Sequence, residues 1–163
     1  MTYKRIQDSL ITGIKKFKDV VPDVDHFFVP ELSVDEQPTR PFFTFAVVDD
    51  YQRVTFHDYE NEPWVMKYQL KSHADSDIEA KDMAFSLRKL LESQQLQYDL
   101  AQIGIGINSV DPMPPLNETF STRIEYASGI YVSLMVNDSY TDPTQPGQIE
   151  DLSISTKFKK EGN

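Results

Sequence analysis

The sequence predicts an α+β fold, with a mixed or mainly antiparallel β-sheet flanked by an N-terminal helix and one long central helix. Two observations support this class. Apolar residues recur at steps of three and four over residues 6–21 and 80–91, whereas residues 64–72 and 130–136 alternate between two faces. The order helix, strands, helix, strands is that of an α+β domain and not of a regular βαβ repeat. With 163 residues, 39% of them hydrophobic, the chain can bury a substantial core. We therefore expect one domain over residues 1–158.

The N-terminal segment has the pattern of an amphipathic helix of about 18 residues. Its apolar stripe ends at Pro22, which cannot continue a helix. The acidic, proline-rich connection that follows, up to Pro41, predicts an extended loop with one short edge strand. The residues of the stripe are Ile6, Leu10, Ile14, Phe17 and Val21.

The middle of the chain predicts a hairpin, a third strand and the long helix. Residues 42–48 and 51–56 have strand composition, and Asp49-Asp50 between them is typical of a turn. Residues 64–72 alternate as a strand with one wet face. Ser76 and Glu79 form a capping box, which predicts a helix from there to about residue 94.

The last third predicts further strands. These lie at residues 103–107, 119–128, 129–137 and 152–158, with a long turn-rich loop over 138–151. We expect residues 159–163 to be a disordered tail.

Several patterns that resemble chemical sites have simpler structural explanations. Gly104-x-Gly106 lies in a predicted strand with no helix after it, so it lacks the amides that hold a pyrophosphate; the glycines instead predict a close approach of a neighbouring backbone or ring. His73, Asp75, Asp77 and Glu79 resemble the start of a calcium loop, but the loop glycine and the twelfth-position glutamate are missing. The capping box explains the same residues.

Nucleophilic and metal-dependent catalysis find no support in the residue pattern. The chain has no cysteine and three histidines, His26, His57 and His73, at spacings that match no metal-binding motif. No Gly-x-Ser-x-Gly motif occurs, and the carboxylate pairs Asp49-Asp50 and Glu150-Asp151 fall at predicted turns. We predict no catalytic, cofactor-binding or metal-binding residue, and a protein that is not an enzyme.

The charge of the chain is uneven. The formal net charge is −10, yet residues 1–20 carry +3 and residues 152–163 carry +2, while residues 21–63 carry −8. Binding of nucleic acid over the whole surface is disfavoured, because it requires clustered Lys and Arg. The basic ends serve either solubility or contacts with acidic surfaces of another copy. No apolar run is long enough for a signal peptide or a membrane span, so we expect a soluble protein made in the cytoplasm.

Aromatic and methionine side chains are abundant on the predicted strands. Large apolar groups fall on both faces of these strands. We expect one face to pack in the core, and the other to be covered either by a neighbouring protein or by a second layer of helix from the same chain. The residues are Phe42, Phe43, Phe45, Trp64, Tyr68, Phe120, Tyr126, Tyr131 and Met135.

The order of these elements resembles that of the neck or tail terminator proteins of tailed bacteriophages. The resemblance extends from about Ile6 to Val136. It rests on the N-terminal helix, the acidic connection, the strand that starts at Pro41, the passage from Met66 to Leu91, and the strands around Arg123–Tyr126 and Ile130–Val136.

The resemblance implies a structural virion protein that forms a ring, usually a hexamer, at the end of the tail tube. Such a ring joins the tube to the neck and leaves a channel for DNA. It implies partners in the tube and neck proteins, DNA that passes without sequence-specific binding, no membrane, no cofactor and assembly in the host cytoplasm. The alternatives are another head-to-tail completion or tail tube protein, or a small cytoplasmic ligand-binding or enzymatic domain.

Overall fold

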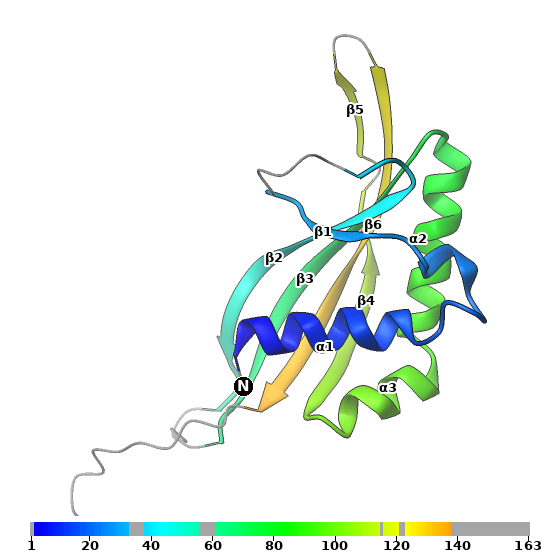
Figure 1. Cartoon of the computed structure of the whole chain (residues 1–163). Helices are drawn as coiled ribbons and strands as arrows, with labels where there is room; N and C mark the ends of the chain where they lie inside the picture. Colours follow the sequence, from blue (N-terminus) through cyan, green and yellow to red (C-terminus); the bar gives the residue numbers. More distant parts are fainter. Residues whose placement is uncertain (1, 33–37, 56–60, 115, 121–122, 138–163) are drawn as a thin grey trace, which may run out of the picture.

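The computed structural model of the chain describes residues 2–32, 38–55, 61–114, 116–120 and 123–137 (Figure 1). It has two layers, a six-stranded mixed sheet in the order β1-β2-β3-β6-β4, with β5 also paired to β6, and a layer of helices. The α+β class is therefore confirmed. The elements are α1 (Tyr3–Lys15), the 3-10 helix η1 (Pro22–Val24), β1 (Phe28–Pro30), β2 (Phe42–Arg53), β3 (Pro63–Ala74), α2 (Asp77–Leu91), α3 (Gln94–Ala101), β4 (Ile105–Pro112), β5 (Leu116–Phe120) and β6 (Arg123–Asn137).

The N-terminal helix is shorter than predicted, although its apolar stripe behaves as expected. The Thr2 side chain caps α1, and the helix ends at Lys15. Tight turns follow, with the amide of Phe17 bonded to the carbonyl of Ile14 at 3.1 Å. Such turns keep a spacing of about three residues, so Phe17 and Val21 still pack against the core beside Ile14.

Strand β2 is one long strand, so the predicted hairpin at Asp49-Asp50 is wrong. Register shifts between Val47 and Asp49, and again between Asp49 and Gln52, accommodate the pair within the antiparallel ladder to β3. Such irregularities are bulges that bend a strand without ending it. On the other side of β2, the short strand β1 pairs in parallel, which confirms the expected edge strand in the proline-rich connection.

The centre of the sheet follows its sequence pattern closely. In β3 every second residue is buried, from Trp64 to Ala74. The apolar face of α2 packs against β3 and β6, and the Ser76 hydroxyl accepts the amide of Glu79 at 3.2 Å, as the capping box predicts. The buried residues that α2 contributes are Ala80, Met83, Ala84, Leu87, Leu90 and Leu91.

After α2, the structure differs most from the prediction at α3 and β6. The helix α3 was not expected; it starts at the cap Ser93 and buries only Leu96 and Leu100, too few residues for a clear periodic pattern. Residues 123–137 form the single strand β6, which replaces the two strands predicted over 119–137. The predicted strand over 152–158, the loop over 138–151 and the tail over 159–163 lie outside the described residues.

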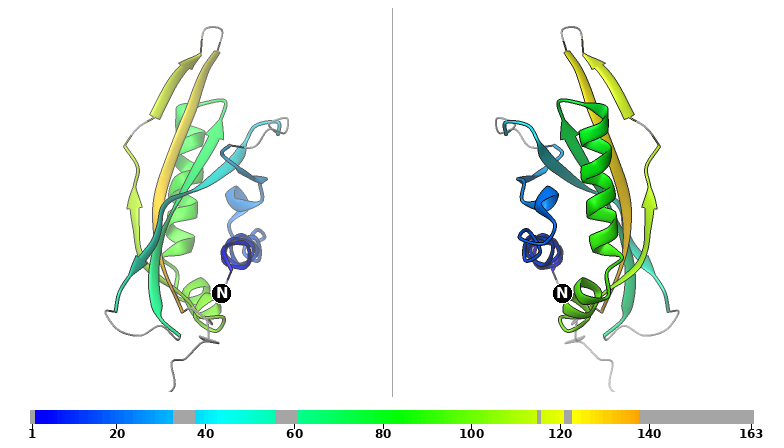
Figure 2. Two further views of the ribbon diagram at one scale, coloured as in Figure 1. Left: turned by 90° about the vertical axis from the view of Figure 1, so that its left-hand side faces the viewer. Right: turned by 90° about the vertical axis from the view of Figure 1, so that its right-hand side faces the viewer.

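All three α-helices of the described chain lie on one face of the sheet (Figure 2). The β5–β6 hairpin extends beyond the helical layer at the end of the molecule where α2 begins (Figures 1 and 2). At this end β6 pairs with β3 only from Tyr126 onward. In the described part of the chain, the sheet therefore has one face that no helix covers, called the open sheet face below, and one projecting hairpin.

Candidate interaction surfaces

The open sheet face carries polar and apolar side chains side by side. Lys67, on β3, lies 5.2 Å above the ring of Tyr131 on β6. From the connection after β1, the Glu31 carboxylate pairs with Lys71 and accepts a hydrogen bond from Gln69 at 2.8 Å. Most of these side chains are half-buried in the described structure. One alternative from the aromatic pattern was a second layer of helix over this face. In the part of the chain that the structure describes, no helix covers it (Figure 2).

The aromatic side chains divide between the two faces. Phe43, Phe45, Trp64 and Tyr68 belong to the core beneath the helices. Phe42 is buried on the opposite face, where its ring stacks on His73 at 4.8 Å. Of the others in the predicted set, Tyr126 and Tyr131 are half-buried and Met135 is 39% exposed; the side chain of Phe120 is not among those described.

A polar and aromatic cluster joins the start of α1 to the sheet. The Tyr3 hydroxyl donates to the Asp50 carboxylate at 2.5 Å, and the Tyr3 ring lies 5.5 Å from Trp64. The hydrogen bond to Asp50, with a smaller contribution from burial, raises the pKa of Tyr3 to about 12. The same bond holds the pKa of Asp50 below its usual range. Asp50 thus lies within β2, where it holds the start of α1 against the sheet, and it does not form the predicted turn.

A second carboxylate, Glu62, is almost fully buried beside this cluster. It is 3% exposed and accepts hydrogen bonds from Tyr51 and Arg53, each at 2.6 Å, and from Thr55 at 3.4 Å. The bonds from Tyr51 and Arg53, in that order, lower the pKa of Glu62. Sequence reasoning missed this residue, since it lies in a polar stretch before β3 with no distinctive pattern. Its oxygens are engaged by protein donors, which indicates a structural role.

The residues that resembled a calcium loop do not come together as ligands. His73 contacts the Thr44 hydroxyl at 2.9 Å through Nε2, Asp75 lies 3.6 Å from Arg40, and Asp77 pairs with Lys81 at 2.6 Å. In the described part of the chain, no group of three or more His, Asp or Glu side chains is placed to hold a metal ion. Of the other histidines, His26 packs near Phe43, and His57 lies outside the described residues.

The glycines differ from their predicted role. Gly104 has φ of 80° just after α3, a conformation that glycine adopts without strain. A side chain on Gly106 would meet Met135 at 3.7 Å, an ordinary contact, so the predicted close approach is wrong at this position. A close approach occurs instead at Gly129 on β6, where an added Cβ would lie 2.9 Å from the Leu70 carbonyl oxygen.

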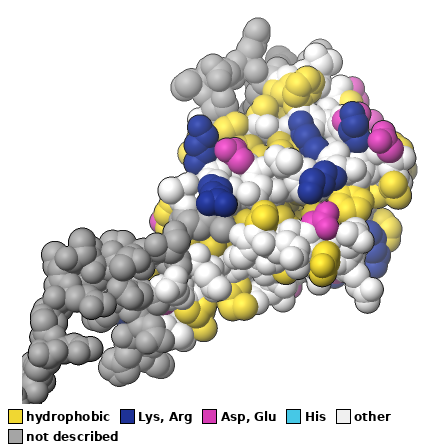
Figure 3. Space-filling view, turned by 60° about the horizontal axis from the view of Figure 1, so that its bottom comes forward, with side chains coloured by type: hydrophobic (Ala, Val, Ile, Leu, Met, Phe, Trp, Pro, Cys, Tyr) yellow, Lys and Arg dark blue, Asp and Glu magenta, His cyan; other side chains and the backbone are white. Residues whose placement is uncertain are grey.

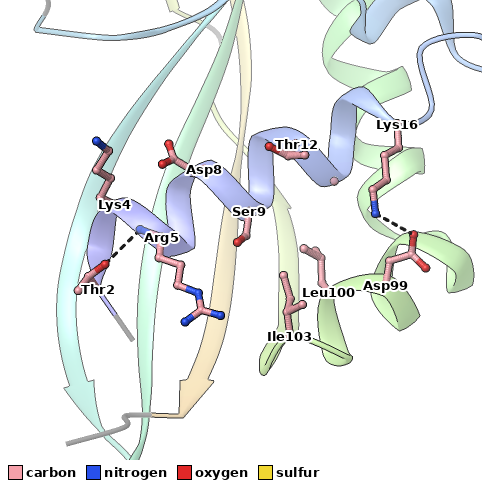
Figure 4. Close-up of a pocket in the computed structure, with 11 residues that line it drawn as sticks. Thr2, Lys4, Arg5, Asp8, Ser9, Thr12, Lys16, Asp99, Leu100 and Ile103 are labelled. Atoms are coloured by element: carbon pink, nitrogen blue, oxygen red, sulfur yellow. Dashed lines mark hydrogen bonds and ion pairs between the residues drawn. The ribbon is translucent and has the colours of Figure 1, made fainter.

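A groove of about 420 Å³ runs between α1 and α3 (Figure 4). Leu100 and Ile103 rise toward α1 from the α3 side and form an apolar floor, and the Arg5 side chain extends from α1 toward them. At the other end Lys16 lies 3.8 Å from Asp99. Basic side chains are spread over the surface when the molecule is viewed from this end (Figure 3).

A second groove, of about 430 Å³, lies between the turns after α1 and helix α2. Its walls include Phe17, Val20 and Phe85, and the last two are 79% and 60% exposed. Exposed apolar side chains at this density are typical of surfaces that contact other proteins. Both grooves lie on the helical layer, opposite the open sheet face.

Comparison with known proteins gives one family. The family described as phage neck terminator protein matches residues 8–162, which is nearly the whole chain. None of the curated proteins matches the sequence. No helix in the described part of the chain has both the length and the apolar character needed to cross a bilayer. The family is one of structural proteins, located by its name at the neck of the phage. On the strength of the match over residues 8–162, the chain belongs to the phage neck terminator proteins.

Proposed function

We propose that the protein forms a ring, of six copies as the resemblance to tail terminators implies, that ends the phage tail tube and joins it to the neck while leaving a channel for DNA. The observation that carries this proposal is the family match over residues 8–162. The open sheet face and the two grooves support it, because a subunit of a closed ring needs contact surfaces on more than one side. In this role the protein is not an enzyme and needs no cofactor. We propose assembly in the host cytoplasm, as one domain over residues 1–158.

The net charge supports a channel that does not hold DNA. At −10 per copy, a ring multiplies the negative charge around its axis. Such a charge repels phosphate, whereas a DNA-binding protein gains affinity from clustered cations that release counterions. We expect the assembled protein not to retain duplex DNA at physiological salt. Strong retention under that condition would contradict the repulsive channel.

Light scattering and negative-stain imaging of the purified protein test ring formation directly. The expected result is a ring with rotational symmetry. Since a terminator can remain monomeric until it meets its tube, purified tail tubes should also be incubated with the protein, with buffer alone as the control. We expect a cap at one end of the tube. A monomer at every concentration that also leaves the tubes uncapped would refute the proposal.

Another head-to-tail completion protein or a tube protein would share the α+β plan, and the tube experiment separates these functions. A tube protein would add along the length of the tube, and a completion protein of the head would bind the neck and not the tube.

A further inference from the structure

The α1–α3 groove and the start of α2 have complementary surfaces. We propose that, in the ring described above, the groove of one copy binds the first turn of α2 of a second copy, with Ile78 over the apolar floor and Glu79 and Asp82 facing Arg5. This inference rests on the proposed assembly and names the surfaces that would build it. The occupant is a second copy of this chain.

The groove combines an apolar floor with an available cation. Ile103 is 41% exposed, whereas Leu100 beside it is buried. The accessible apolar surface of the floor therefore comes mainly from Ile103. The Arg5 side chain reaches toward this floor (Figure 4). No ion pair engages the Arg5 guanidinium among the residues that the structure describes. Lys16, at the far end, is partly neutralised by Asp99.

The start of α2 offers the opposite combination. Ile78 is 73% exposed, and its neighbours Glu79 and Asp82 are exposed as well. Within the described ranges, neither carboxylate forms an ion pair, whereas Asp77 is paired with Lys81. An apolar side chain beside carboxylates that no described cation pairs therefore matches a groove with an apolar floor and a guanidinium that no described carboxylate pairs. Electrostatic complementarity of this kind directs association and fixes its orientation.

The two surfaces cannot meet within one molecule. The helix α2 starts at the end of the molecule where the hairpin projects, whereas α1 and α3, which line the groove, lie toward the other end (Figure 1). Because α2 is packed along the sheet through Ala80, Met83 and Leu87, its first turn cannot move to the groove of its own copy. The contact must join two copies. Different patches on the two sides make a head-to-tail interface, and such interfaces repeat until a ring closes.

Cysteine cross-linking tests the contact, since the sequence has no native cysteine. The double variant Ile78→Cys with Ile103→Cys, treated with a short bis-maleimide, should give a ladder of covalent multimers. Mixing the two single variants should give dimers but no ladder, because each copy then carries one thiol. The pair Ile78→Cys with Val48→Cys, in which Val48 lies on β2 and is 50% exposed, is the matched control and should give no ladder.

Charge exchange provides a second readout. Arg5→Glu should raise the concentration at half assembly by about tenfold or more, and Glu79→Arg with Asp82→Arg should do the same. All three changes together should restore assembly. A glutamate in the first turn of α1 favours the helix dipole, so Arg5→Glu should still fold. Lys18→Glu, with the same change of charge outside the groove, is the control.

The results separate this contact from ring formation itself. If rings form but the thiols of Ile78→Cys and Ile103→Cys do not cross-link, or if Arg5→Glu leaves the concentration at half assembly unchanged, the proposed contact is wrong and the proposed ring still stands. A protein that stays monomeric, leaves tubes uncapped and gives no ladder would overturn both. A ladder together with restored assembly in the exchanged variant supports the contact.

Discussion

Gly129 on β6 gives the sharpest test of how the sheet is packed. It is buried, pairs with Lys71 of β3, and an alanine Cβ would lie 2.9 Å from the Leu70 carbonyl oxygen and 2.6 Å from the Met113 sulfur. The methionine side chain can rotate away. The Leu70 carbonyl cannot, because it belongs to the backbone of the central strand. Gly129→Ala therefore requires β3 and β6 to shift apart locally.

The cost follows from two opposing terms. Overpacking of this kind costs about 1–3 kcal/mol. Replacing glycine lowers the entropy of the unfolded chain and returns about 0.4–1 kcal/mol. We expect Gly129→Ala to lower the free energy of unfolding by about 1–2 kcal/mol. For a chain of this size, that corresponds to a decrease in Tm of about 2–8 °C.

Gly106→Ala on β4 is the matched control. Its Cβ would meet its nearest neighbour at 3.7 Å, and its φ is not positive, so the entropy term acts without a clash. We expect this variant to be as stable as the wild type or slightly more stable. Urea and thermal unfolding, followed by circular dichroism, measure both variants. A Gly129→Ala protein as stable as the wild type, or an equal loss in Gly106→Ala, would refute the reasoning.

Two other predictions concern single side chains. The Tyr68 hydroxyl is buried with no hydrogen-bond partner in the described structure, and burial raises the pKa of Tyr68 to about 12. Because the folded pKa lies above the unfolded value of 10.0, the native state binds the proton more tightly, and stability should fall as the pH rises from about 10 to 12. Tyr68→Phe should be neutral or stabilising at pH 7, because it removes an unpaired polar group. It should also reduce the loss of stability between about pH 10 and 12. Urea titrations at several pH values measure both effects, and a clear destabilisation at pH 7 would show that the hydroxyl has a hydrogen-bond partner. Ser76→Ala removes the cap of α2 and should cost about 1 kcal/mol, whereas Ser76→Asp should retain most of the stability; equal unfolding midpoints for wild type and Ser76→Ala would contradict the cap.

Local patterns predicted most of the secondary structure because they depend on neighbouring residues. The alternation of β3, the apolar stripe of α1 and the capping box at Ser76 all appear as expected. Errors occurred where a distant contact overrides a local preference. Asp49-Asp50 favours a turn, but the bond from Tyr3 to Asp50 and the pairing with β3 keep β2 continuous.

The interaction surfaces were harder to predict than the strands. An acidic chain with basic ends left both solubility and contacts between copies open, and neither groove has a linear pattern in the sequence. The α1–α3 groove combines Arg5 with Ile103, which are far apart in the sequence, and α3 itself was not predicted. Glu62 also gave no signal, because its donors Tyr51, Arg53 and Thr55 are ordinary polar residues until β2 and β3 pair.

The sequence by itself determined the α+β class, the absence of any thiol chemistry and the acidic body with basic ends, because these depend on composition and short-range periodicity. The order of elements was enough for a resemblance to the terminator family. Only the tertiary structure decided that the described helices cover one face of the sheet, that β2 and β6 are single strands, and that a groove forms between α1 and α3, away from the start of α2. These features depend on strand pairing and helix packing between distant residues, which the free energy of the whole fold selects and no local pattern encodes.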